Sequence, residues 1–342
     1  MKGVITSSRW RMTMSIKKKF LVVLIVCLAY GCTQKETTRV LNLTLCGASP
    51  SGLWSLLAAG IDSAMKELYQ NSTVTYQTSG GGFANVRGLR EARCDLALIH
   101  DAEATIAWNG EQPFNKSHTG LRTIAVLYNW APLQLIISKT FVEKHKVYSL
   151  EDIVEKKVPI RILLNRRGNI SSQVGEAMLN AAGATLEDIA NWGGTVTFSA
   201  SEEQGDLMRN RRADAVLNSL FVGHNSILQI ADAVDVTLLP VSQKTASKVA
   251  EQFGIIEYTI PGGSYEWTPE PILTVSLSAH LFALENYPGQ IISNLTEALT
   301  QHIDKLKVVH SAMHPLSVEL MASSDTIPYH DEALKVFTKL GQ

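Results

Sequence analysis

Residues 74–100 place a β-rich run, a glycine turn, a helix-like segment and a second apolar run in immediate succession. The β-rich run covers residues 74–78 and the second apolar run covers residues 96–99. The turn between the first run and the helix is formed by three consecutive glycines: Gly80, Gly81 and Gly82. Because strand, helix and strand in this order form right-handed crossovers, the stretch predicts one unit of a largely parallel sheet.

The glycine turn also predicts a binding function. Glycine lets the backbone approach a ligand closely. The helix that follows offers free N–H groups and a partial positive charge at its N-terminus. We therefore expect the turn at residues 80–82 to hold an anion, a carboxylate in particular.

Two further turns repeat this arrangement. A strand at residues 41–45 is followed by a glycine- and serine-rich turn at residues 47–52 and by a helix from Leu53. Later, a strand at residues 159–164 precedes the turn at residues 165–172. The helix after that turn is expected over residues 173–182, with Ser171 and Ser172 as candidate N-caps. All three turns should lie at the carboxyl ends of parallel strands, where α/β sheets bind ligands.

Two stretches are candidates for strands that cross between domains. The first is a strand at residues 121–128 that is interrupted at residues 129–132 and resumes at residues 133–138; the return strand covers residues 272–282. A strand broken by proline and then resumed favours such a crossing. The predicted division of the chain is lobe 1 at residues 41–132 plus 276–342, and lobe 2 at residues 133–275.

The N-terminus has the pattern of a secretory signal. Three lysines at residues 17–19 precede an apolar run at residues 20–29, and Cys32 follows Gly31. This order of basic, apolar and small residues indicates a signal peptide, and Cys32 resembles the lipidated cysteine of a bacterial lipobox. We expect a lipoprotein signal peptide at residues 1–32 and a tether at residues 33–40. A plain signal peptide is the alternative, and Met12 or Met14 could be the true start in place of Met1.

Two cysteines remain outside the expected signal peptide, Cys46 and Cys94. Cys46 ends its strand, whereas Cys94 precedes its own. If the two strands are parallel neighbours, the sulfurs lie at opposite edges of the sheet, beyond the roughly 7 Å Cα separation that a disulfide allows. The sequence therefore predicts free, buried thiols.

Composition bounds the class of protein. The 342 residues suffice for two domains, and 45% hydrophobic with 18% charged residues favour a sizeable core. The formal net charge of -1 argues against nucleic acid as a partner. Neither the nine histidines nor the cysteines show metal-ligand spacing, so we expect no metal and no cofactor. We also expect no enzyme, because the sequence has no Gly-x-Ser-x-Gly or His-Glu-x-x-His motif.

The order of motifs resembles the TAXI family, the extracytoplasmic solute receptors of tripartite ATP-independent periplasmic (TRAP) transporters. The resemblance covers residues 41–341. Its elements are the turn at 47–52, the Thr-Ser-Gly-Gly-Gly-x-x-Asn-x-x-x-Leu stretch at 78–89, the strand at 94–99, the strand and proline at 121–132, the turn at 167–172, Ile-Pro-x-Gly-x-Tyr at 260–265, and His314-Pro315. Two departures are the serine-rich first turn and the arginines of the third, where family members have glycine, tyrosine or small residues.

The resemblance implies a two-lobed type II periplasmic-binding-protein fold, with each lobe a mostly parallel sheet flanked by helices and two crossing strands between them. It also implies binding of a small organic acid, such as glutamate, another amino acid, or a 2-oxo or dicarboxylic acid. With the signal pattern and Cys32, we expect a periplasmic, lipid-anchored monomer. The implied partners are the membrane permease subunits of a TRAP transporter. A sensor for a signalling kinase and an ABC-type binding protein remain alternatives with the same binding chemistry.

Candidate ligand-binding residues come from the three turns and from nearby aromatics. Arg166 or Arg167 could take a carboxylate bidentately, Arg87 is the corresponding cation of lobe 1, and Asn85 either touches the ligand or caps its own turn. His100 is expected to be a structural hydrogen-bonder. The full set is Ser49, Ser51, Trp54, Gly80, Gly81, Gly82, Phe83, Asn85, Arg87, Tyr128, Arg166, Arg167, Asn169, Ser171, Ser172 and Tyr265.

Overall fold

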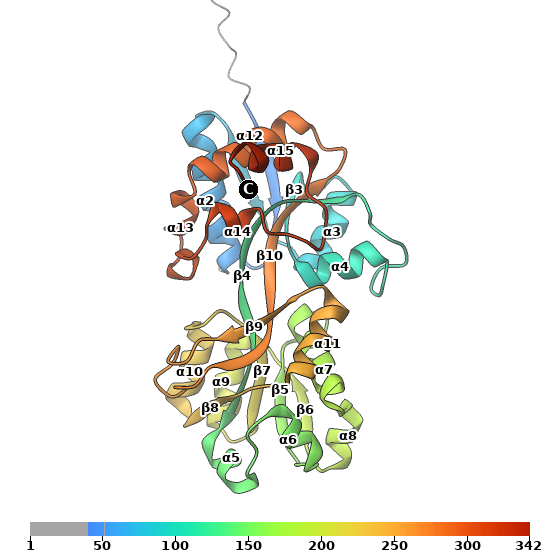
Figure 1. Cartoon of the computed structure of the whole chain (residues 1–342), viewed down its shortest axis with the longest axis vertical. Coiled ribbons are helices and arrows are strands. Elements are labelled where there is room, and N and C mark those ends of the chain that lie inside the picture. The colour runs from blue at the N-terminus through green and yellow to red at the C-terminus, as the bar shows by residue number, and fades with distance from the viewer. Residues whose placement is uncertain (1–39, 51) are drawn as a thin grey trace, which may run out of the picture. The chain divides into compact units, whose positions relative to one another are not determined.

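In the computed structural model the described residues, 40–50 and 52–342, form two α/β lobes joined by two long strands (Figure 1). The predicted signal peptide and tether, with Cys32, and the candidate Ser51 lie outside these residues. We keep the names lobe 1 and lobe 2 for the two halves, and their boundaries stay a prediction.

Lobe 1 is built on three parallel strands, the first part of β4 (Leu121–Ser138) and the last part of β10 (Ile272–Leu284), in the order β2-β1-β3-β10-β4. Its parallel strands are β1 (Asn42–Cys46), β2 (Thr73–Gln77) and β3 (Leu96–His100). The helices between them are α2 (Leu53–Leu68), α3 (Gly82–Arg90) and α4 (Asp101–Asn109). The C-terminal segment adds α12 (Gly289–Gln301), α13 (Asp304–Lys307), η1 (Ser311–Met313), α14 (Val318–Met321) and α15 (Asp331–Lys339).

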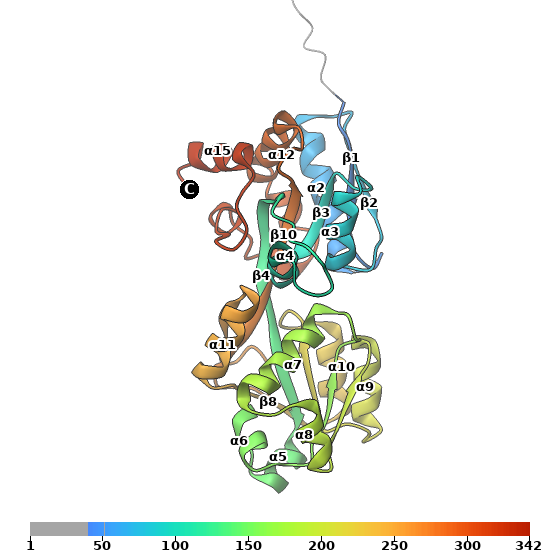
Figure 2. The same ribbon diagram turned by 90° about the vertical axis from the view of Figure 1, so that its right-hand side faces the viewer.

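Lobe 2 repeats the same architecture around strands β5, β6 and β7 (Figure 1), and Figure 2 shows its helices α5 to α10. Its strands are β5 (Arg161–Leu164), β6 (Thr195–Phe198), β7 (Ala215–Ser219) and β8 (Val236–Leu239). Its helices are α5 (Lys139–His145), α6 (Leu150–Glu155), α7 (Ile170–Ala182), α8 (Leu186–Asn191), α9 (Ser201–Arg209) and α10 (Asn225–Ala233). Helix α11 (Gln243–Phe253) packs against both α7 and α4, and β9 (Ile256–Ile260) pairs with β10.

The crossing strands are β4 (Leu121–Ser138) and β10 (Ile272–Leu284), which pair antiparallel. Beyond that pairing, β4 continues into lobe 2, where it pairs with β7 and β8. The predicted interruption at residues 129–132 is wrong, since β4 runs through it without a break. Proline lacks a backbone N–H but keeps its carbonyl. The Pro132 carbonyl accepts a hydrogen bond from Leu220 N at 3.2 Å, so proline is tolerated in this strand. The predicted two-lobed α/β fold is confirmed.

Helix α7 begins earlier than the sequence suggested. Its first residue is Ile170, and its N-cap is Asn169, whose side chain accepts a hydrogen bond from Ser171 N at 2.9 Å. The predicted N-caps Ser171 and Ser172 lie instead in the first turn, both buried. Ser172 donates its hydroxyl to the carbonyls of Arg166 and Asn169, so it stabilises the turn from inside the helix. Asparagine is as good an N-cap as serine, and the two cannot be ranked by residue type alone.

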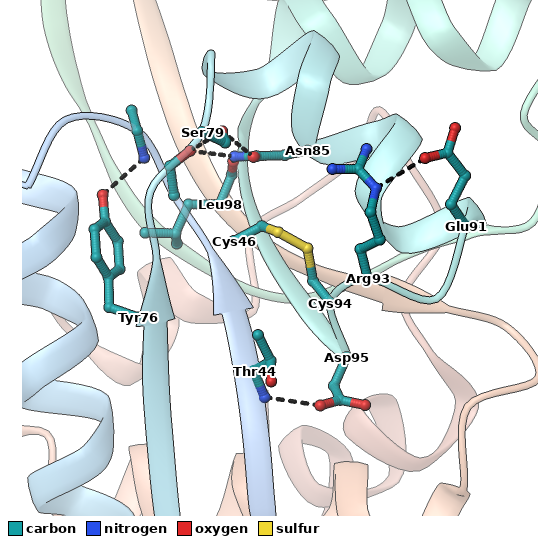
Figure 3. The surroundings of a disulfide bond; sticks show 12 residues. Thr44, Cys46, Tyr76, Ser79, Asn85, Glu91, Arg93, Cys94, Asp95 and Leu98 are labelled. Atoms are coloured by element: carbon teal, nitrogen blue, oxygen red, sulfur yellow. Dashed lines mark hydrogen bonds and ion pairs between the residues drawn. A yellow bond between two sulfur atoms is a disulfide. The ribbon is translucent and has the colours of Figure 1, made fainter.

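The predicted free thiols are wrong, because Cys46 and Cys94 form a disulfide with a Cα–Cα distance of 5.7 Å (Figure 3). The strands are parallel neighbours, as expected, but they are staggered. The end of β1 pairs with the start of β3, Cys46 opposite Ala97. The connection after α3 then brings the Cys94 side chain against Gly88 of that helix. A Cβ at Gly88 would come within 2.8 Å of the Cys94 Sγ, so glycine makes room for the bridge.

Reduction of this disulfide should lower the free energy of unfolding by about 4 kcal/mol, from the chain-entropy relation for two cysteines separated by 48 residues. Urea unfolding of the oxidised and reduced protein measures the difference. The Cys46→Ala/Cys94→Ala double variant is the control and should not respond to reductant. Equal midpoints for the oxidised and reduced protein would contradict the bridge.

Candidate functional site

A cavity of about 350 Å³ is lined by residues of both lobes. Lobe 1 contributes the turn after β1, the glycine turn before α3 and the start of α4. Lobe 2 contributes the turns after β5 and β7 and the start of α9. All three turns that the sequence marked therefore reach the same cavity, at the carboxyl ends of their strands.

An aromatic wall closes the lobe 1 side of the cavity. Trp54 Nε1 donates a hydrogen bond to the Tyr128 hydroxyl at 3.0 Å, and the Trp54 ring lies 4.8 Å from the ring of His100. Burial raises the pKa of the Tyr128 phenol, which stays protonated. Trp130 lies beside Tyr128, and its buried Nε1 has no acceptor among the described residues. The wall thus offers aromatic faces to the cavity.

Glu103 brings a carboxylate to the same side. It lies in the first turn of α4, and its Oε2 is 3.3 Å from His100 N and 3.2 Å from His100 Nδ1. A Cβ on Gly82 would overlap the Glu103 carboxylate, so that carboxylate lies directly against the first residue of α3. Glycine at position 82 therefore makes room for a side chain of this protein.

On the lobe 2 side, a network of polar side chains fixes the floor of the cavity. Ser171 donates to Asn218 Oδ1 and accepts from Ser219 N, each at 2.8 Å. Asn165 donates to the same Asn218 oxygen at 3.0 Å, while Asn218 Nδ2 donates to Ser201 Oγ at 2.9 Å. The network ties the ends of β5 and β7 to the first turns of α7 and α9.

A third group of side chains joins the two lobes. The Phe221 ring is 4.9 Å from His224 in its own lobe and 5.1 Å from His310, which follows α13 in lobe 1. Burial lowers the pKa of His224, and the nearby Glu202 partly opposes that effect. His224 Nδ1 accepts a hydrogen bond from Ser226 N at 3.1 Å, so the N–H of the neutral ring is at Nε2. The two lobes are thus in contact across the cleft.

Half of the sequence-predicted site residues line this cavity. They are Ser49, Trp54, Gly80, Gly81, Gly82, Tyr128, Asn169 and Ser171. Seven others among the described residues do not line it: Phe83, Asn85, Arg87, Arg166, Arg167, Ser172 and Tyr265.

Two of these seven have clear structural roles. Asn85 is fully buried, and its amide donates to Gly47 O at 2.8 Å and to Leu98 O at 2.7 Å, which binds the first two turns together. Asn85 was expected either to touch the ligand or to cap its own turn. In the structure its amide holds the turns and does not line the cavity. Tyr265 donates its hydroxyl to Gln134 at 2.8 Å inside the second core of lobe 2.

The candidate arginines lie outside the cavity. The Arg167 guanidinium stacks over the Phe198 ring at 3.8 Å, and Arg166 lies 3.8 Å from Glu203 at the surface. Arg87, with Phe83, lines a second, more open cavity of about 510 Å³ that meets the first at Gly80 and Gly168. Among the residues that the structure describes, no lysine or arginine lines the first cavity.

Sequence reasoning missed several lining residues. The ones with polar side chains are His100, Glu103, Asn165, Ser201, Glu202, Ser219 and His224. One signal could have revealed the first pair. His100 ends a strand and Glu103 follows three residues later in a helix, so both lie at the sheet edge where the other turns were placed.

Two kinds of feature are absent from residues 40–50 and 52–342. No helix there combines the length and apolar character that crossing a bilayer requires. No three His, Cys, Asp or Glu side chains gather there in a way that could hold a metal ion.

Solved structures of similar fold include a malate-bound protein and a solute-binding protein. MatC from Rhodopseudomonas palustris with bound malate aligns at 13% identity over 89% of this chain and 97% of its own, with a TM-score of 0.52. A TctC solute-binding protein from Polaromonas without ligand aligns at 12% identity over 82% of this chain and 90% of its own, with a TM-score of 0.55. At such identities the likeness establishes the fold, a two-lobed periplasmic-binding-protein fold.

The family is established by the sequence itself. Residues 45–341 match the NMT1-like family, and the chain belongs to that family. No curated protein matches the chain.

Asp101 connects the site to the crossing strands. It follows His100, is buried, and its Oδ2 accepts a hydrogen bond from Ser278 N of β10 at 3.1 Å. Burial raises the pKa of Asp101 to about 7. Between its ordinary pKa of 3.8 and about 7, this carboxyl therefore holds more protons in the folded protein than in the unfolded chain, so the contribution of Asp101 to stability falls as pH rises.

Asp101→Asn should remove this loss. Relative to the parent protein, the variant should gain stability as pH rises through that window, by about 1.4 kcal/mol per pH unit. Burial lowers the pKa of the nearby His280 to about 3, and that opposite pH effect is present in both proteins and cancels. Urea unfolding at pH 4, 5.5 and 7 measures the difference, with the exposed Asp232→Asn as the surface-charge control. A difference that stays constant with pH would contradict the assignment.

Proposed function

We propose that this protein is an extracytoplasmic solute-binding protein that captures a small organic acid by closure of its two lobes and delivers it to a membrane permease. The observation that carries the proposal is the cavity of about 350 Å³, whose walls come from both lobes. A ligand that contacts both lobes stabilises the closed arrangement over the open one. The crossing strands β4 and β10 are where a hinge motion would take place.

The solute class is proposed from the site and from a structural neighbour. The cavity volume lies within the range of small-molecule sites, and its walls combine aromatic faces with a few polar groups. The MatC structure of similar fold holds malate, which supports a small organic acid. The resemblance to TAXI receptors supports the finer assignment, with the permease of a TRAP transporter as partner.

The cavity suits binding better than hydrolysis. A serine nucleophile needs a base within hydrogen-bond reach. Ser171 is bonded to Asn218, and Ser219 donates to Ala131 O at 2.6 Å. His100 contacts Glu103, and His224 accepts from a backbone N–H. No serine and histidine side chains of the described residues are bonded to each other in this cavity, which supports a receptor that does not turn over its ligand.

The location is part of the proposal. The signal at residues 1–32 would export the chain, and a lipid on Cys32 would hold it at a membrane facing the periplasm. The disulfide between Cys46 and Cys94 supports an oxidising compartment, because such bridges persist there and are rare in the cytosol.

Ligand-dependent thermal unfolding tests the function. The purified protein is heated with amino acids, 2-oxo acids and dicarboxylic acids, with neutral sugars as a control set. A true ligand at 100 times its Kd should stabilise the protein by about 2.7 kcal/mol. We expect at least one organic acid to raise the melting temperature in a concentration-dependent way, and the sugars not to. If no organic acid shifts the transition, the proposed function is wrong.

A further inference from the structure

The glycine turn that the sequence marked as an anion site already lies against an anion of the protein itself. The Glu103 carboxylate fills the space beside Gly82, at the first residue of α3. A helix N-terminus carries a partial positive charge, which a carboxylate at this position compensates. A carboxylate of the solute would therefore meet negative charge at this turn.

Glu103 is placed to act on the solute as well as on the helix. Its side chain is 6% exposed and lines the cavity. Its Oε2 faces His100, whereas its Oε1 accepts no hydrogen bond from any residue that the structure describes. A carboxylate with an unused oxygen in a ligand cavity is an acceptor for an N–H group, and above all for a charged one.

The other charged side chain that lines the cavity is also acidic. Glu202 of lobe 2 also lines it, and the described lining residues include no lysine or arginine. A donor lies elsewhere on its walls, at Nε2 of His224. The cavity thus offers separate places for a positive group and for a carboxylate.

We propose that Glu103 forms the subsite for a protonated amine of the solute, so that the cleft selects amine-bearing acids over 2-oxo and dicarboxylic acids of the same size. This inference rests on the proposed function and narrows its solute class. The ammonium group contacts Glu103 at the start of α3, and the carboxylate of the solute contacts the His224 donor. A dicarboxylate would place like charge against Glu103, which disfavours it.

Matched ligand pairs test the proposal on the unaltered protein. Isothermal titration compares glutamate with 2-oxoglutarate, aspartate with malate, and alanine with pyruvate. In the pair that contains the tightest binder, the amine-bearing member should bind at least about tenfold more tightly, which is about 1.4 kcal/mol. This comparison needs no variant, so it does not depend on whether a variant folds.

The Glu103→Gln variant tests the residue. Glutamine keeps the shape beside Gly82 but removes the charge, so binding of the amine-bearing acid should weaken at least about tenfold while its oxo or hydroxy partner binds as well or better. Glu203→Gln is the matched control, because Glu203 lies near Arg166 outside the cavity and should leave both affinities unchanged.

The outcomes separate the two proposals. If an oxo or dicarboxylic acid binds as tightly as its amine partner, or if Glu103→Gln lowers both affinities equally, the amine subsite is refuted and the solute-binding function stands. If no organic acid of any class binds, the proposed function fails and the subsite fails with it.

Discussion

The antiparallel pairing of β4 with β10 is the constraint on which the rest of this structure depends. Both strands belong to the sheet of lobe 1, and β4 continues into the sheet of lobe 2. Because each sheet is fixed to these strands by hydrogen bonds, the carboxyl ends of β1 and β3 face those of β5 and β7 across one cavity.

Local parts of this arrangement could be predicted from the sequence, because they depend on short-range patterns. The strand, turn and helix units around residues 80–82 and 165–172 follow from periodicity and glycine placement, and the structure contains them. One failed prediction depended on strand register. Cys46 and Cys94 form a disulfide because β1 and β3 are staggered, and the stagger is set by tertiary packing that no residue pattern announces.

In the site, too, the position of the backbone turns could be predicted, whereas the contacts of their side chains could not. The three turns reach the cavity because strand direction fixes which end of a sheet they occupy. The sequence could not predict which side chains line the cavity, because that depends on the other contacts that each side chain makes in the folded protein. Arg167 stacks on Phe198, and the Asn85 amide donates hydrogen bonds to two backbone carbonyls. A cation at a turn is therefore weak evidence for an anion site until its competing contacts are known.

Glu103 changes what the glycine turn means. Glycine at position 82 was interpreted as room for a ligand, and the structure shows that the room is taken by a carboxylate of the next helix. The positive end of α3 then stabilises a residue of the receptor, and that residue presents negative charge to the solute. A helix N-terminus in a cleft therefore predicts an anion nearby without predicting whose anion it is. In this cleft the anion is Glu103 of the protein itself, so the turn presents negative charge to the ligand where the sequence predicted positive charge.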